Sequence, residues 1–161
     1  MRLFLILLAF LLLPAIGNTA TIVVPDDEAS IQDAIAAAGN GDLILVKPGN
    51  YGPIDYLGKE LTIRSDIDAN PSTLDLASES TFITGNTWAG VSIVNGTGKT
   101  QVLEGFTIRA GTGYPMGGST YGGGIYCFNS EPIIANNVIR FNSADFGGGI
   151  YNTVSKSRPS A

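Results

Sequence analysis

Residues 121–126 read YGGGIY and residues 146–151 read FGGGIY, so one six-residue pattern returns 25 positions later with a single conservative change. A weaker echo relates residues 106–109 (FTIR) to residues 137–140 (NVIR), 31 positions later. Repeats spaced by about 20 to 50 residues are typical of stacked arrays. In a β-solenoid, equivalent residues of successive coils lie about 4.8 Å apart. We therefore expect Ile125 to stack on Ile150, and Gly124 on Gly149.

Outside this repeat, the chain is organised as short apolar runs between turn residues. Glycine contributes 21 of the 161 residues and charged residues only 14%, a composition that disfavours both long helices and disorder. The runs fall at residues 43–46, 61–63, 91–94, 106–108, 124–126 and 138–139. Together with the repeat, they predict an all-β fold, a parallel β-helix of four to five coils without antiparallel hairpins.

One segment predicts an α-helix, over residues 30–38. Ser30 can cap its N-terminus, and Asp33 stands at the third helical position, where it can bond back to the cap. Gly39 follows as a predicted left-handed C-cap. An amphipathic helix can cover the open apolar end of a solenoid. We expect one face of this helix to do so, through Ile31, Ala34, Ile35 and Ala38.

The N-terminus has the layout of a secretory signal peptide. Arg2 is followed by an apolar run over residues 3–13 and by Pro14, with cleavage expected after Gly17 or Ala20. The run is shorter than the roughly 20 residues that span a bilayer. We therefore assign residues 1–20 to a signal peptide and expect no membrane insertion after cleavage. The mature chain would be secreted, periplasmic or at the cell surface.

The remaining chain is predicted to hold one domain. Residues 21–152 would form the N-terminal cap and the first coils of the β-helix, and residues 153–161 a frayed or truncated tail. The sequence after Tyr151 does not predict a polar cap. Because a solenoid end without a cap exposes apolar surface and strand edges, the last coil is expected either to fray or to associate end to end with a second copy.

Composition also excludes several function classes. The chain has no His, which removes imidazole acid–base chemistry and His-dependent nucleophiles. Cys127 is the only cysteine, so no intramolecular disulfide can form. A formal net charge of −5 gives no electrostatic footprint for nucleic acid. No cofactor-binding motif is found.

Several segments resemble the start of right-handed parallel β-helix repeat proteins of the pectin-lyase-like superfamily. The resemblance rests on residues 30–35 (SIQDAI), 47–51 (KPGNY), 58–65 (GKELTIRS) and 132–139 (PIIANNVI). It implies a right-handed coil whose N-terminal end is capped by a helix. It implies no particular activity, because this cap occurs on lyases, hydrolases, epimerases and proteins without a known reaction.

Three acidic residues are weak candidates for a Ca²⁺ site. Asp66 and Asp68 follow the run at residues 61–64, where an extended chain would place both on one side, and Asp75 lies downstream. Carboxylates are ligands that Ca²⁺ prefers. A solvated loop is nevertheless the preferred interpretation. No residue set matches the motifs of the superfamily's lyases, and the catalytic residues, if any, are unknown.

Two function classes stay open at this point. The first is an exported β-helix module with a binding or display role, with polysaccharide as the expected partner. The second is the N-terminal fragment of a polysaccharide lyase or another carbohydrate-active enzyme of the superfamily. The lack of an acid–base set favours the first.

Overall fold

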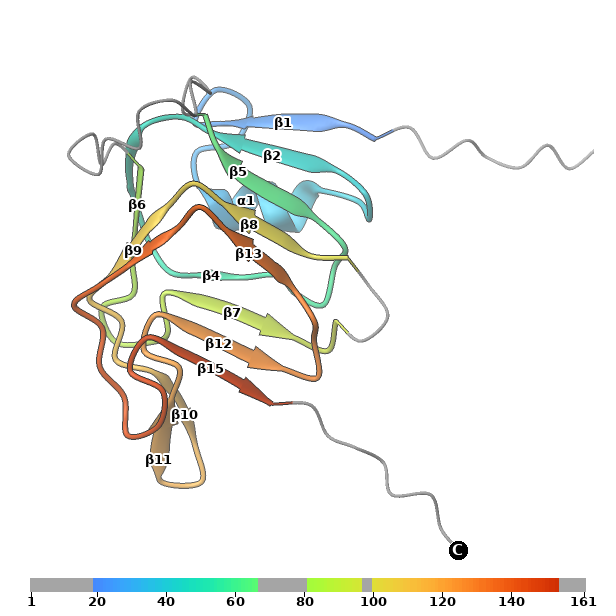
Figure 1. The fold of residues 1–161 in the computed structure, drawn as a ribbon. Coiled ribbons are helices and arrows are strands. Elements are labelled where there is room, and N and C mark those ends of the chain that lie inside the picture. Colours follow the sequence, from blue (N-terminus) through green and yellow to red (C-terminus); the bar gives the residue numbers. More distant parts are fainter. Residues whose placement is uncertain (1–18, 67–80, 97–99, 154–161) are drawn as a thin grey trace, which may run out of the picture.

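Three parallel β-sheets and one helix make up most of the computed structural model, which describes residues 19–66, 81–96 and 100–153 (Figure 1). Sheet A contains β1 (Thr21–Val24), β2 (Leu43–Val46), β5 (Thr62–Ser65), β8 (Val102–Glu104) and β13 (Ile133–Ala135). Sheet B contains β3 (Gly49–Tyr51), β6 (Thr81–Thr84), β9 (Thr107–Arg109) and β14 (Val138–Ile139). Sheet C contains β4 (Ile54–Asp55), β7 (Val91–Val94), β12 (Ile125–Phe128) and β15 (Ile150–Thr153).

From β2 onward the chain visits the three sheets in rotation. The strands follow one another as β2-β3-β4, β5-β6-β7, β8-β9-β12 and β13-β14-β15, so each circuit adds one strand to each sheet. Every pairing within these sheets is parallel. The predicted all-β character is confirmed, with largely parallel strands and one helix among the described residues.

The two sequence echoes appear as strand pairs. Ile125 of β12 pairs with Ile150 of β15, which is the strong repeat. Thr107 of β9 pairs with Val138 of β14, which is the weak one. Both offsets in sequence are therefore offsets between neighbouring strands of one sheet.

One hairpin departs from the predicted pattern. β10 (Tyr114–Met116) and β11 (Ser119–Tyr121) pair antiparallel and extend the connection from β9 to β12, so the expectation of no antiparallel hairpin is wrong here. The cause is the two-residue turn between them. Gly117 and Gly118 have φ of 62° and 87°, and two consecutive positive φ values suit the tight turn that joins twisted antiparallel strands.

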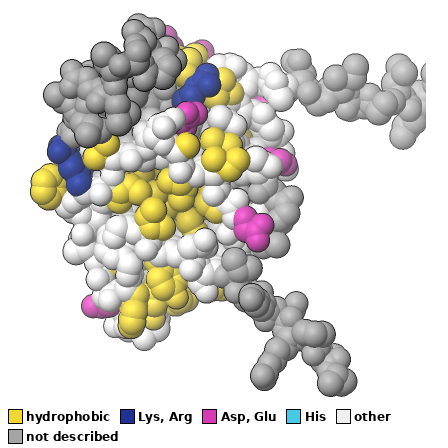
Figure 2. All heavy atoms as spheres, viewed as in Figure 1, with side chains coloured by type: hydrophobic (Ala, Val, Ile, Leu, Met, Phe, Trp, Pro, Cys, Tyr) yellow, Lys and Arg dark blue, Asp and Glu magenta, His cyan; other side chains and the backbone are white. Residues whose placement is uncertain are grey.

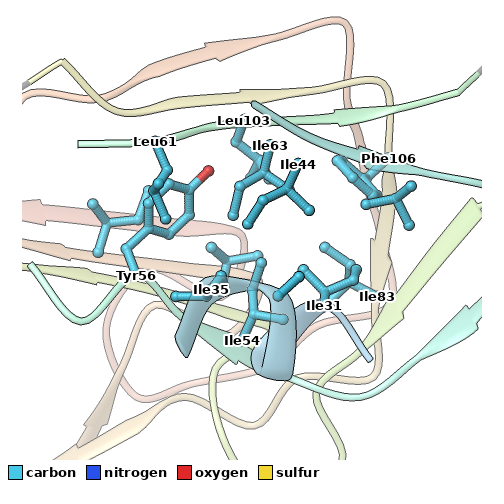
Figure 3. Packing of buried hydrophobic residues seen from close by; sticks show 14 of the residues in the cluster. Ile31, Ile35, Ile44, Ile54, Tyr56, Leu61, Ile63, Ile83, Leu103 and Phe106 are labelled. Atoms are coloured by element: carbon cyan, nitrogen blue, oxygen red, sulfur yellow. The ribbon is translucent and has the colours of Figure 1, made fainter. Parts of the chain in front are cut away.

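The core fills the space between the three sheets. Inward-facing aliphatic side chains lie in register from strand to strand, as in Ile44–Ile63–Leu103 of sheet A and Ile54–Val91–Ile125 of sheet C. Tyr56 and Phe106 belong to the same core and lie on opposite sides of the Ile44, Ile63 and Leu103 side chains (Figure 3).

Helix α1 (Ile31–Ala37) packs its apolar face against the same core, with Ile31, Ala34, Ile35 and Ala38 all buried. Ser30 caps the helix as predicted, accepting a hydrogen bond from the Asp33 N–H at 3.1 Å.

The predicted C-cap of α1 is wrong. The helix ends at Ala37, and the following Ala38 is extended. Positive φ first occurs at Gly41, at 91°. The last carbonyls find another partner, because the Lys59 ammonium donates to the carbonyl oxygens of Ile35, Ala36 and Ala38 at 2.7–2.8 Å. The Lys59 side chain, distant in sequence, therefore satisfies the terminal carbonyl oxygens in place of the expected glycine cap.

The end of the sheets opposite α1 is apolar and exposed. Within the described residues, β13, β14 and β15 are the last strands of their sheets. Ile133 is 54% exposed, Ile150 44% and Phe141 80%. Figure 2 shows hydrophobic side chains gathered in the middle of the visible face, and again toward the part where β10 and β11 lie.

Candidate functional site

The outer surface of sheet C carries the candidate site. Because side chains alternate along a strand, burial of Ile54, Val91 and Ile125 turns their neighbours outward. Those neighbours stand in register across the four strands, in the order Asp55, Ser92, Tyr126 and Tyr151. The row thus changes from polar to aromatic as it crosses the sheet.

Further aromatic side chains gather around Tyr126. The Tyr114 ring, from β10, stacks on it with centroids 4.5 Å apart and planes 7° from parallel. Trp88 meets Tyr114 edge-on at 5.7 Å, and Tyr151 stacks alongside Tyr126 at 6.0 Å. We call Trp88, Tyr114, Tyr126, Phe128 and Tyr151 the aromatic face. Trp88 is 48% exposed, so this face has a large ring open to solvent.

The β10–β11 hairpin is held in place by polar and aromatic contacts. The Asp145 carboxylate accepts hydrogen bonds from the Thr120 N–H at 2.8 Å and from the Thr120 hydroxyl at 3.1 Å. The Tyr121 ring stacks on Phe146 with centroids 5.0 Å apart. Because Tyr121 pairs with Tyr114 across the hairpin, these contacts also fix the position of Tyr114.

Glycine is required beneath the hairpin. A Cβ at Gly123 would clash with the carbonyl oxygen of Gly148, and a Cβ at Gly111 would clash with that of Gly123. The repeated Gly-Gly-Gly run thus lets neighbouring backbones approach closely just before β12 and β15 begin.

A small cleft of about 210 Å³ lies at the carboxyl ends of β4 and β7. Its lining residues are Asp55, Leu57, Gly58, Val94 and Asn95. Ligand pockets for small molecules usually start near 300 Å³, so this cleft can take part of a ligand rather than enclose one.

Asp55 is held firmly at the cleft. One carboxylate oxygen accepts a hydrogen bond from the Leu57 N–H at 2.7 Å. The Gln32 side chain, from α1, accepts from the Asp55 N–H at 2.7 Å and donates to its carbonyl oxygen at 3.2 Å. The capping helix thus also fixes the acidic residue of the candidate site.

The Tyr126 hydroxyl and the Cys127 thiol both stay protonated near pH 7. Burial raises the pKa of the Tyr126 hydroxyl, and the neighbouring Tyr114, Tyr151 and Tyr121 raise it further, so the phenol stays neutral near pH 7. Burial also raises the pKa of the Cys127 thiol to about 12, which leaves almost no thiolate to act as a nucleophile.

The Ca²⁺ hypothesis finds only one of its residues in the described part of the chain. Asp66 follows β5, is half-buried, and its N–H donates to the Val46 carbonyl oxygen at 2.7 Å. Asp68 and Asp75 lie outside the described residues. Within residues 19–66, 81–96 and 100–153, no group of three or more His, Cys, Asp or Glu residues is placed to hold a metal ion. The Ca²⁺ site stays a prediction.

The residues expected to stack lie in, or directly before, β12 and β15, which are neighbouring strands of sheet C. Ile125 is buried and pairs with the more exposed Ile150. The Gly124 N–H donates to the Gly149 carbonyl oxygen at 2.9 Å.

Sequence reasoning missed the aromatic face and Asp55. The repeat itself contained Tyr126 and Tyr151, whose place after an inward-facing Ile already predicts an outward ladder. Trp88 and Tyr114 gave no comparable pattern, because Trp88 lies in the connection between β6 and β7 and Tyr114 reaches sheet C only through the hairpin.

No known protein family, curated protein or solved structure matches this chain in the three comparisons made. In the part of the chain that the structure describes, no helix is long and apolar enough to cross a membrane.

Proposed function

We propose that this chain is an exported right-handed parallel β-helix module that binds polysaccharide through the aromatic face and the adjoining cleft. The rotation of the chain through three parallel sheets supports the β-helix, as does the helix over one end of their shared core. The apolar run at residues 3–13 supports export, with the module secreted, periplasmic or displayed at the cell surface.

The aromatic face is the observation that carries the binding proposal. Sugar rings present apolar C–H faces, which pack on flat aromatic rings, and hydroxyl edges, which need hydrogen-bonding partners. Trp88 and Tyr114 offer rings, while Asp55 and Asn95 of the cleft offer polar groups on the same sheet. The cleft of about 210 Å³ is too small to enclose a small molecule, so a polymer that extends along the sheet suits this surface better.

Trp88 makes the proposal directly testable, because it is the only Trp in the chain. Addition of a bound glycan should shift its fluorescence, and the protein should be retarded in gels that contain that glycan. Tyr114→Ala and Trp88→Ala should each remove most of the retardation.

Phe141→Ala is the matched control, since Phe141 is an exposed aromatic residue outside the aromatic face. Near-ultraviolet circular dichroism would establish that each variant stays folded. Folded Tyr114→Ala and Trp88→Ala variants that bind as well as the wild type would refute the proposed site.

A further inference from the structure

We infer that the aromatic face selects neutral, hydroxyl-rich glycans and rejects acidic polysaccharides, with Asp55 as the specificity-determining residue. This inference rests on the proposed function, because it names the ligand class of the same site. It follows from the distribution of charge around sheet C.

The charge on this surface is negative and comes from one side chain. Among the described residues, Asp55 is the only charged side chain in the four strands of sheet C, the β10–β11 hairpin and the segment that carries Trp88. The Asp145 carboxylate lies outside these segments and is engaged by Thr120 of the hairpin. A glycan on this face therefore meets the Asp55 carboxylate and aromatic rings.

The described cations belong to other surfaces. Lys59 is engaged by three carbonyl oxygens at the end of α1. Arg64 lies on sheet A, and Arg109 lies on sheet B with its guanidinium 4.1 Å from the Phe82 ring centroid. Lys47 pairs with Asp26, and Arg140 lies over the Phe141 ring. None of these five cations lines the cleft beside Asp55. Among the residues that the structure describes, a uronate carboxylate would therefore find no cation lining the cleft.

The same carboxylate favours a neutral sugar. Sugar hydroxyls donate to a carboxylate in charge-assisted hydrogen bonds, which are about twice as strong as neutral ones. Asp55 can accept them in a fixed position, because Leu57 and Gln32 hold it. Attraction for hydroxyls and repulsion of carboxylates thus come from one residue.

The test compares two oligosaccharides of equal length, a neutral glucan and a polygalacturonate, in low-salt buffer with EDTA. Low salt limits screening, and EDTA prevents a divalent ion from bridging Asp55 to the uronate. Trp88 fluorescence reports binding. We expect the wild type to bind the neutral oligomer at least about fivefold more tightly.

Asp55→Asn keeps an acceptor for the Leu57 N–H but removes the charge. It should strengthen polygalacturonate binding by about fivefold and leave binding of the neutral oligomer equal or weaker. Asp27→Asn is the matched control, because the Asp27 carboxylate also accepts a backbone N–H, from Val23, but lies outside sheet C. It should change neither affinity.

The outcomes separate this inference from the proposed function. Equal or tighter binding of polygalacturonate by the wild type overturns the selectivity but keeps polysaccharide binding. An unchanged preference in Asp55→Asn overturns the role of Asp55. Binding of neither oligomer overturns both the selectivity and the proposed function.

Discussion

At the scale of single residues, buried polar groups matter most where a long-range partner satisfies them. The Tyr56 side chain is fully buried, and its hydroxyl donates to the Val102 carbonyl oxygen at 2.7 Å. Tyr56→Phe removes this donor but keeps the ring. We expect it to lower the free energy of unfolding by about 1 kcal/mol, as measured by urea denaturation at pH 7. A loss as large as that of a core cavity would show that the ring itself had moved.

The raised pKa of Tyr56 also predicts how the free energy of unfolding depends on pH. Burial raises the pKa of Tyr56 well above its ordinary value, so the folded chain keeps the phenol proton where the unfolded chain loses it. The stabilisation is therefore complete below about pH 10, the ordinary pKa of tyrosine, and is lost as the pH rises further. Tyr56→Phe should show a smaller loss of stability between neutral and strongly alkaline pH. Parallel curves for the two proteins would contradict this origin of the pH dependence.

At the scale of elements, two residues paired in one sheet should contribute differently to the free energy of unfolding when one is buried and the other is exposed. Ile125 and Ile150 are paired in sheet C, but Ile125 is buried while Ile150 is 44% exposed. Ile125→Ala should destabilise the fold by about 2–5 kcal/mol, the range for a large-to-small change in a packed core. Ile150→Ala, its matched control, should cost clearly less. Equal losses in chemical denaturation would mean that Ile150 is covered in solution.

Elements set by local or repeated patterns could be predicted from the sequence, whereas those set by distant contacts could not. The spacing of Ile31, Ala34 and Ile35 after Ser30 predicted α1, and the Gly-Gly-Gly-Ile-Tyr repeat predicted the register of β12 and β15. The end of α1 was missed because Lys59, more than 20 residues away, satisfies its carbonyls. The aromatic face was missed for the same reason, since a hairpin places Tyr114 on Tyr126.

At the scale of the whole molecule, the two ends of the sheets differ. Helix α1 covers one end, while Ile133, Phe141 and Ile150 are exposed at the other. We expect association in solution to join two exposed ends, because the helix blocks a head-to-tail contact. Such a contact closes as a symmetric dimer rather than a fibre.

Sedimentation velocity should therefore show a concentration-dependent monomer–dimer equilibrium, and Ile133→Lys should shift it to monomer. The same charge placed at Ala36, on the exposed side of α1, is the control and should change nothing. A wild type that stays monomeric at all concentrations would refute association through this end.

Hydrogen exchange should be slowest around residues 43–63, near the covered end, and fastest around residues 146–152.

The central claim is that sheet C binds a neutral glycan on its outer surface. A crystal structure of the chain with a bound neutral glucan oligosaccharide tests it most directly. We expect a sugar ring packed on Trp88 or Tyr114, with a neighbouring unit donating a hydroxyl to Asp55. A sugar bound on sheet A or sheet B, with the aromatic face left empty, would contradict it.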